Sequence, residues 1–144
     1  MKLIVFTDGG ARGNPGPAGF GVVIQDAHGT VMEEFGEYIG ETTNNQAEYR
    51  GMVAALERAS ALGATEVSAF ADSELLVKQL HRVYKVKNAG LAPLFVKIWN
   101  LAQSFRTCTF THVRREQNKG ADAMVNAAID VRGSVVGTRN GRGS

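Results

Sequence analysis

Four acidic side chains stand at positions where an isolated carboxylate would be unfavourable for folding. Asp8 and Asp72 each follow an apolar run, at residues 3–7 and 67–71. Glu48 lies on the apolar stripe of an expected helix, and Asp122 lies at the start of another. Carboxylates that converge on one point repel each other. Hard divalent cations such as Mg²⁺ take oxygen ligands and relieve that repulsion. The four acids therefore point to phosphoryl chemistry with two metal ions.

Each acid also has a simpler explanation when it is taken alone. Asp8 could begin a turn, and Asp72 could contribute to a helix cap. Asp122 could be a first-turn acid that is favoured by the helix dipole. Glu48 is harder to explain in this way, because an inward carboxylate needs a partner. The four positions together favour a shared site over four separate structural roles.

Composition limits the class of protein. The chain has 144 residues, of which 44% are hydrophobic and 21% charged, as expected for one globular domain. Cys108 is the single cysteine, which excludes a disulfide framework and predicts a small core side chain. No run approaches the roughly 20 apolar residues of a membrane span, and the apolar start is too short for a signal peptide. We therefore expect a soluble, cytoplasmic protein, with a monomer as the default state.

The charges are distributed unevenly along the chain. Residues 1–74 hold 4 Lys/Arg and 11 Asp/Glu, whereas residues 75–144 hold 12 Lys/Arg and 3 Asp/Glu. There is no acid between Leu75 and Arg115. Such asymmetry is typical of proteins that bind a polyanion such as nucleic acid. A solvated basic face explains the charge pattern equally well, so charge alone leaves both interpretations open.

The pattern of apolar residues predicts an α/β fold. The expected strands span residues 2–7, 20–25, 31–39, 67–71 and 107–113, and the expected helices span 45–62, 74–82, 91–105 and 120–131. The first three strands form an antiparallel meander, and residues 8–17 are interpreted as a turn. The first, fourth and fifth strands are connected through helices and should run parallel. Open sheets bind ligands at the carboxyl ends of parallel strands, where Asp8 and Asp72 would become neighbours.

The chain is expected to form one domain over residues 1–131, followed by a tail. Residues 132–144 contain four glycines, three arginines and no acid. Such a composition cannot bury enough apolar surface to form a core, so we expect the tail to be disordered.

Five motifs in a fixed order identify a resemblance. They are FTDGG at 6–10, NPGP at 14–17, TTNNQAE at 42–48, DS at 72–73 and NKGAD at 118–122. Together they resemble type 1 ribonuclease H over residues 1–131, and five motifs in this order are far more specific than any one of them. The resemblance implies a ribonuclease H-like five-stranded mixed sheet, three antiparallel strands followed by parallel strands, flanked by helices.

The resemblance also implies an activity. Members of this family are metal-dependent endonucleases that cut the RNA strand of RNA–DNA hybrids and leave 5′-phosphate and 3′-hydroxyl ends. Asp8, Glu48, Asp72 and Asp122 would be the catalytic residues and the ligands of two Mg²⁺ ions, with Mn²⁺ as an alternative. Double-stranded RNA is a further candidate substrate.

The same resemblance suggests residues for substrate binding. The backbone of Gly9, Gly10 and Ala11 could approach RNA 2′-hydroxyls, which distinguish RNA from DNA. Asn14, Asn44 and Asn45 resemble residues that reach the minor groove of the hybrid, and Thr43 resembles one that holds a DNA phosphate. Helix capping is the alternative explanation for Thr43 and Asn44, and the two roles are compatible.

The sequence departs from the family pattern in two places. Many members carry a long basic protrusion after the second helix, whereas only residues 83–90 stand here, which indicates a short form. Many members also have a histidine in the loop after the last strand. Here residues 114–118 contain none, so Arg115 or Glu116 is the candidate replacement, and His112 is expected to be structural.

Two other functions remain as alternatives. A binding module could grip a hybrid or double-stranded RNA without cutting it, although binding alone would favour Lys or Arg at the acidic positions. An ATPase of the sugar-kinase or actin type shares the sheet topology, but 144 residues leave no second lobe to close over ATP.

Overall fold

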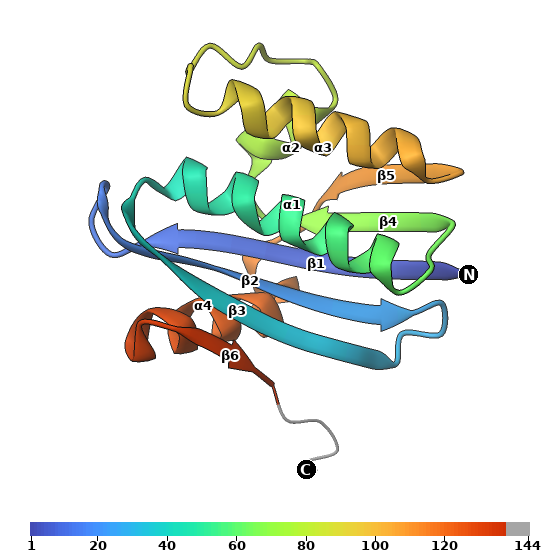
Figure 1. Ribbon diagram of the computed structural model, residues 1–144, viewed down its shortest axis with the longest axis horizontal. Helices are drawn as coiled ribbons and strands as arrows, with labels where there is room; N and C mark the ends of the chain where they lie inside the picture. The colour runs from blue at the N-terminus through green and yellow to red at the C-terminus, as the bar shows by residue number, and fades with distance from the viewer. Residues whose placement is uncertain (138–144) are drawn as a thin grey trace.

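One mixed β-sheet organises the molecule. The computed structural model describes residues 1–137 and has the strand order β5-β4-β1-β2-β3-β6 (Figure 1). The strands are β1 Lys2–Ala11, β2 Gly16–Asp26, β3 Val31–Thr42, β4 Glu66–Ala71, β5 Thr107–His112 and β6 Ser134–Val136. The helices are α1 Asn44–Ala61, α2 Glu74–Leu80, α3 Ala92–Ser104, the 3₁₀ turn η1 Arg115–Gln117 and α4 Lys119–Val131.

The strand directions confirm the predicted α/β class. Strands β1, β2 and β3 form an antiparallel meander, and β4 and β5 run parallel to β1. The sheet has six strands where five were predicted. The sixth, β6, pairs antiparallel with residues 35–37 of β3. The expectation of a disordered tail was therefore wrong for Ser134–Val136, because three residues are too few to show a strand pattern in the sequence. Residues 138–144 lie outside the described residues.

Strand β1 is longer than predicted, and its extension passes through the glycines. The pairing of β1 with β2 continues to Ala11 opposite Ala18, so Asp8, Gly9 and Gly10 lie inside a strand and not in a turn. By contrast, the pairing of β1 with β4 ends at Thr7 opposite Ala71. Asp8 and Asp72 each follow this last pair, which confirms that they are neighbours at the carboxyl edge.

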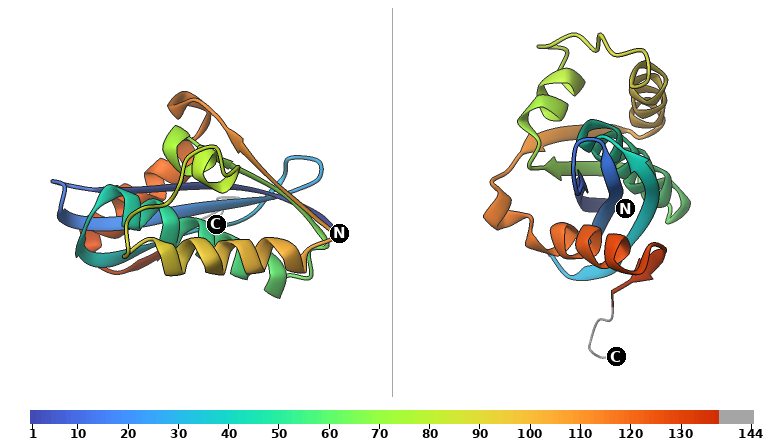
Figure 2. Two further views of the ribbon diagram at one scale, coloured as in Figure 1. Left: turned by 90° about the horizontal axis from the view of Figure 1, so that it is seen from above. Right: turned by 90° about the vertical axis from the view of Figure 1, so that its left-hand side faces the viewer.

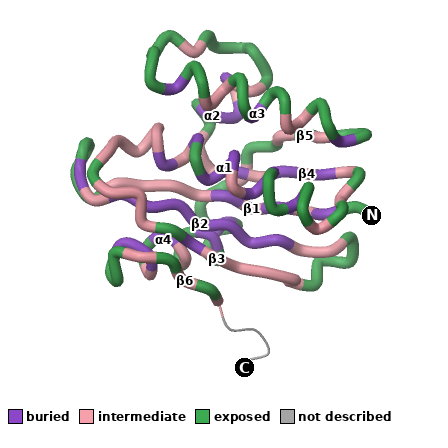
Figure 3. Tube along the Cα trace, viewed as in Figure 1, coloured by how far each residue is buried: buried purple, intermediate pink, exposed green. Residues whose placement is uncertain are grey.

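Helices cover the two faces of the sheet unequally. Gly51 of α1 packs against Phe20, whereas the next residue of β2, Gly21, packs against Ala121 of α4. Since neighbouring residues of a strand point to opposite faces, α1 and α4 lie on opposite sides (Figure 2). The main core lies between the sheet and helices α1, α2 and α3, where the fully buried chains include Leu3, Val22, Met52, Leu56 and Ile98 (Figure 3).

Local signals set the helix boundaries near the site. The Thr43 hydroxyl accepts a hydrogen bond from Gln46 N at 3.2 Å and caps α1. The Ser73 hydroxyl accepts from Leu76 N at 3.1 Å and caps α2. Gly63, with φ of 91°, follows the end of α1. None of the helices in the described part is long and apolar enough to cross a membrane.

Cys108 lies half-buried in β5 and packs against the main core. Burial raises the pKa of its thiol to about 11, so the group is neutral at physiological pH. This environment agrees with the prediction of a small core side chain.

Candidate active site

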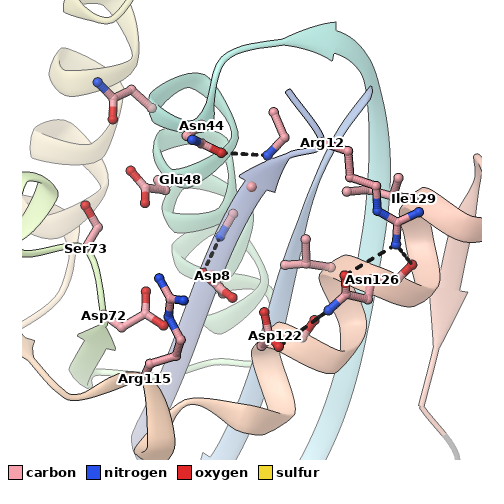
Figure 4. A pocket seen from close by; sticks show the side chains of 15 residues that line it. Asp8, Arg12, Asn44, Glu48, Asp72, Ser73, Arg115, Asp122, Asn126 and Ile129 are labelled. Atoms are coloured by element: carbon pink, nitrogen blue, oxygen red, sulfur yellow. Dashed lines mark hydrogen bonds between the residues drawn. The ribbon is translucent and has the colours of Figure 1, made fainter. Parts of the chain in front are cut away.

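The four predicted acids line one pocket at the carboxyl edge of the sheet. The cavity measures about 410 Å³, and it receives Asp8 from β1, Glu48 from α1 and Asp72 from the end of β4 (Figure 4). Asp122, from the first turn of α4, completes the set. Four elements that are far apart in the sequence therefore deliver one carboxylate each to the same cavity.

Glycines allow the helices to come close enough to do this. A Cβ atom at Gly9 would collide with the backbone of Ala47 and Glu48, so α1 packs directly on the strand that holds Asp8. A Cβ atom at Gly21 would collide with the carbonyl oxygen of Ala121, next to Asp122. Glycine at both positions thus lets backbone meet backbone.

The acids stand in a site where negative charge is poorly tolerated. The pKa of Asp8 is raised to about 8, first by burial, then by the charge of Asp72 and by a hydrogen bond with Asp122. A hydrogen bond from Gly9 N, at 2.9 Å, opposes the rise. Burial also raises the pKa of Glu48 to about 7, with a hydrogen bond to Ser73 opposing the rise and the charge of Asp72 adding to it. Burial and the neighbouring carboxylates therefore make the ionised forms of Asp8 and Glu48 unfavourable.

The donor chemistry of the pocket fits a hard divalent cation. The acids supply only oxygen ligands, and Mg²⁺ and Mn²⁺ prefer such ligands. Within residues 1–137, however, no three Asp, Glu, His or Cys side chains already form a group that could hold a metal ion. The carboxylates share a pocket without being gathered around one point.

Five of the seven predicted substrate-binding residues line the same pocket. They are Gly9, Gly10, Ala11, Asn44 and Asn45. The Asn44 Oδ1 atom accepts a hydrogen bond from Ala11 N at 2.7 Å, which ties the start of α1 to the end of β1. The glycine-rich backbone and the two amides thus form one wall beside the acids.

The other two predicted residues, Asn14 and Thr43, are not among the residues that line the pocket. Asn14 Oδ1 accepts a hydrogen bond from Asn44 N at 3.0 Å. The Thr43 hydroxyl is engaged in capping α1, which is the alternative role that the sequence left open. Asn14 thus holds the start of α1 beside the loop between β1 and β2, whereas Thr43 stabilises the first turn of α1 itself.

Sequence reasoning missed two polar residues of the pocket, Arg12 and Asn126. Asn126 Nδ2 donates to the backbone oxygen of Asp122 at 3.1 Å and to its Oδ2 at 3.4 Å. Arg12 forms an ion pair with Asp130 at 2.7 Å and contacts the Asn126 side chain at 3.4 Å. The i,i+4 spacing of Asp122 and Asn126 is a signal that could have indicated this support. Nothing in the sequence marked Arg12.

The loop before α4 contributes Arg115 to the pocket. Its side chain lines the cavity together with Asp72 (Figure 4). Arg115 has no ion pair within the part of the chain that the structure describes. Glu116 and His112 do not line the pocket, and His112 is exposed at the end of β5. Of the two candidate replacements for the loop histidine, Arg115 is therefore the one that lines the pocket with the acids.

Known proteins resemble this chain over nearly its whole length. Residues 6–128 match the family model described as Reverse transcriptase-like. The bifunctional protein Rv2228c of Mycobacterium tuberculosis is 47% identical over 131 residues, which are 90% of this chain and 36% of that protein. Ribonuclease HI of Halobacterium salinarum is 40% identical over 129 residues, covering 90% of this chain and 65% of that protein. The chain thus spans less than two thirds of the length of these curated relatives.

Solved structures show the same relationship in three dimensions. RNase H1 from Halobacterium salinarum has a TM-score of 0.88 at 38% identity, covering 91% of this chain and 99% of that chain. LC11-RNase H1, isolated from compost and solved in complex with an RNA/DNA hybrid, has a TM-score of 0.85 at 48% identity, covering 90% and 97%. These likenesses, with the shared sheet and the order of the motifs, show that the chain belongs to the type 1 ribonuclease H family.

Proposed function

We propose that this chain is an endonuclease that hydrolyses the RNA strand of RNA–DNA hybrids with two Mg²⁺ ions, leaving 5′-phosphate and 3′-hydroxyl ends. The observation that carries this proposal is the convergence of four carboxylates from four elements on one pocket. The likeness to LC11-RNase H1, which was solved with an RNA/DNA hybrid, supports the choice of substrate. Mn²⁺ would serve as an alternative ion.

The four carboxylates would hold the ions. When bound, the ions would supply an activated water and neutralise the charge that develops on the leaving 3′-oxygen. Asp8 would hold the ions together with Asp72 and Asp122, because its carboxylate interacts with both of these side chains. Glu48 interacts with Asp72 and the Ser73 hydroxyl, on the side of the pocket next to α1.

The wall beside the acids would select the RNA strand. Gly9, Gly10 and Ala11 bring backbone groups to the pocket surface, where a 2′-hydroxyl could donate and accept hydrogen bonds. The amides of Asn44 and Asn45 line the same wall, and they would meet base edges in the shallow minor groove of a hybrid. The hydroxyl of Thr43 would have to share its capping role with a phosphate.

A second, basic surface would hold the duplex. Residues 76–114 contain no acid, and five of their seven cations lie on α2, on α3 or in the loop that connects them: Lys78, Arg82, Lys85, Lys87 and Lys97. Lys78 lies 5.3 Å from the Tyr84 ring, and Arg82 lies 5.7 Å from the Trp99 ring. Both rings are more than two-fifths exposed, so cations and aromatic faces are presented together to solvent. Phosphates and bases are recognised by these two kinds of group.

The Asp72→Asn variant tests the catalytic proposal. It keeps the shape of the side chain and removes its charge, so we expect the hybrid cleavage rate with Mg²⁺ to fall by at least about 100-fold. Asp26→Asn is a matched control, because Asp26 only accepts turn hydrogen bonds from His28 N and Thr30 N, which an asparagine can also accept. Cleavage by Asp72→Asn at the parent rate would contradict the proposal.

A gel assay with labelled hybrid, double-stranded RNA and double-stranded DNA separates cutting from binding. We expect cleavage of the RNA strand of the hybrid that depends on Mg²⁺, and no cleavage of double-stranded DNA. A pure binding module would shift the mobility of the hybrid without giving product at any Mg²⁺ concentration. The double-stranded RNA lane measures how strictly the enzyme requires a DNA strand.

A further inference from the structure

Asn118 joins the acid-bearing elements behind the pocket. Its side chain is almost fully buried, with 1% exposure. The Nδ2 atom donates a hydrogen bond to Thr7 O at 2.8 Å and a second one to Asp72 Oδ2 at 3.3 Å. The backbone oxygen of Asn118 accepts from Asp122 N at 3.1 Å. One residue thus contacts the strand of Asp8, the carboxylate of Asp72 and the helical turn of Asp122.

These contacts are not those of an ordinary helix cap. Asn118 occupies the N-cap position of α4, yet its side chain makes no capping hydrogen bond to that helix. The amide is turned inward, and its Oδ1 atom is buried and has no hydrogen-bond partner within residues 1–137. A buried unpaired oxygen is unfavourable for folding. The side chain therefore makes neither a capping hydrogen bond nor a hydrogen bond through Oδ1. Its hydrogen bonds are both made by Nδ2.

The position of the Nδ2 atom matters because the pairing of β1 with β4 has ended there. The ladder between β1 and β4 stops at Thr7 opposite Ala71, one residue before each aspartate. Beyond this point no ladder hydrogen bond fixes Asp8 relative to Asp72. Asn118 spans the gap, because it bonds to the last paired carbonyl of β1 and to the carboxylate that follows β4.

The orientation of the amide is also determined. If the amide were turned over, Oδ1 would face Thr7 O and Asp72 Oδ2, which both need a donor. In the observed orientation, Asp72 Oδ2 accepts a hydrogen bond from Nδ2 of the buried Asn118 side chain. This hydrogen bond restrains the Asp72 carboxylate at the wall of the pocket.

We propose that Asn118 is a positioning residue that orients Asp72 against the end of β1 and thereby sets the affinity of the acid cluster for Mg²⁺. The proposal rests on the proposed function for the identity of the ion and adds a residue that never touches substrate. Groups that hydrogen-bond to metal-binding side chains typically change metal affinity or activity by about 10- to 100-fold when they are removed.

The test compares Asn118→Ala and Asn118→Leu with the parent chain. Mg²⁺ binding is measured by calorimetry without substrate, and hybrid cleavage is measured as a function of Mg²⁺ concentration. We expect both variants to require about 10-fold more Mg²⁺ in both measurements, with the KM for hybrid at saturating Mg²⁺ within about twofold of the parent value. Asn118→Leu keeps the branching of the side chain, fills the space in place of the amide and removes the unpaired oxygen, so it keeps the test decisive if the alanine variant does not fold.

Gln79→Ala is the matched control. Gln79 is also a buried amide, with 7% exposure, but it bonds to the Tyr49 hydroxyl and to Lys85 O and to none of the four acids. We expect this variant to lower Tm without changing the Mg²⁺ midpoint.

The outcomes separate the two proposals. If the Asn118 variants lose stability but bind Mg²⁺ as the parent does, Asn118 is only structural and the inference is wrong. If the parent binds Mg²⁺ but never cuts hybrid, the proposed function fails, while the calorimetric shift still decides the role of Asn118.

Discussion

Gly9 and Glu48 are in direct backbone contact, since the space of a Cβ atom on Gly9 is filled by the Ala47–Glu48 peptide. This contact sets the distance between β1 and α1 at the pocket. It brings the side chain of Glu48 to the cavity that also receives Asp8. A glycine that looks like a turn former in the sequence is in fact the packing point of the site.

Gly9→Ala should therefore damage both the fold and the site. The added methyl group meets backbone that cannot rotate away, and we expect a loss of about 1–3 kcal/mol in the free energy of unfolding, with lower cleavage activity. Urea unfolding and hybrid cleavage measure the two effects. Gly10→Ala is the stability control, because its nearest atoms would lie 3.9 Å away. Equal stability of the two variants would contradict the packing argument.

The stability of the metal-free protein should depend on pH in a particular direction. In the unfolded chain Asp8 loses its proton near its ordinary pKa of 3.8, whereas in the folded chain it keeps the proton up to a pKa of about 8. The unfolded state binds fewer protons between these values, so the free energy of unfolding falls as pH rises from about 4 to about 8. Glu48 adds to this fall between 4.5 and about 7.

Urea unfolding in EDTA at several pH values checks this expectation. The Asp8→Asn variant cannot ionise at this position, and we expect its stability to vary less with pH than that of the parent chain. Equal pH dependence in parent and variant would show that Asp8 is not the group responsible.

Mg²⁺ binding should strengthen with rising pH. A carboxylate must lose its proton before it can bind the ion, and the pKa values of Glu48 and Asp8 are raised to about 7 and about 8. We expect the Mg²⁺ midpoint of hybrid cleavage to decrease between pH about 6 and pH about 8.5. A midpoint that stays constant over this range would mean that the acids are already ionised in the presence of substrate.

Arg115 should contribute to turnover. Its side chain lines the pocket with the acids and has no ion pair within the described residues, so it is available to contact a phosphate of the substrate or product. We expect Arg115→Ala to lower kcat by about 10-fold or more. Arg114→Ala removes the same charge next to the pocket without touching its lining, and we expect it to leave kcat nearly unchanged.

Two truncations should separate β6 from the residues that follow it. Ending the chain after Val131 removes the pairing of β6 with β3, the hydrogen bond from Tyr38 N to Gly133 O and the contact of Arg132 with the Tyr38 ring. We expect this shorter chain to have a lower Tm than a chain that ends after Gly137. Thermal unfolding of both proteins compares them, and equal Tm values would show that β6 adds no stability.

The sequence by itself determined much of the architecture. Alternating and helical apolar patterns are local, and they predicted nine of the elements and the parallel direction of β1, β4 and β5. Asp8 was predicted beside Asp72 at the carboxyl edge of the sheet, because connections through helices leave little choice of strand direction. Glu48 and the apolar Met52 are four residues apart, so a helix places them on the same face, and this spacing predicted that Glu48 faces the sheet.

Other features were decided only by the tertiary structure. A glycine pattern does not distinguish a turn from a close packing point, so the extension of β1 through Gly9 became clear only when α1 was in place. The entry of Asp122 into the pocket depends on the contact of Gly21 with α4, and the role of Asn118 depends on where the pairing of β1 with β4 ends. Such contacts join segments up to 111 residues apart. A local pattern carries no information about which distant backbone group a side chain will meet.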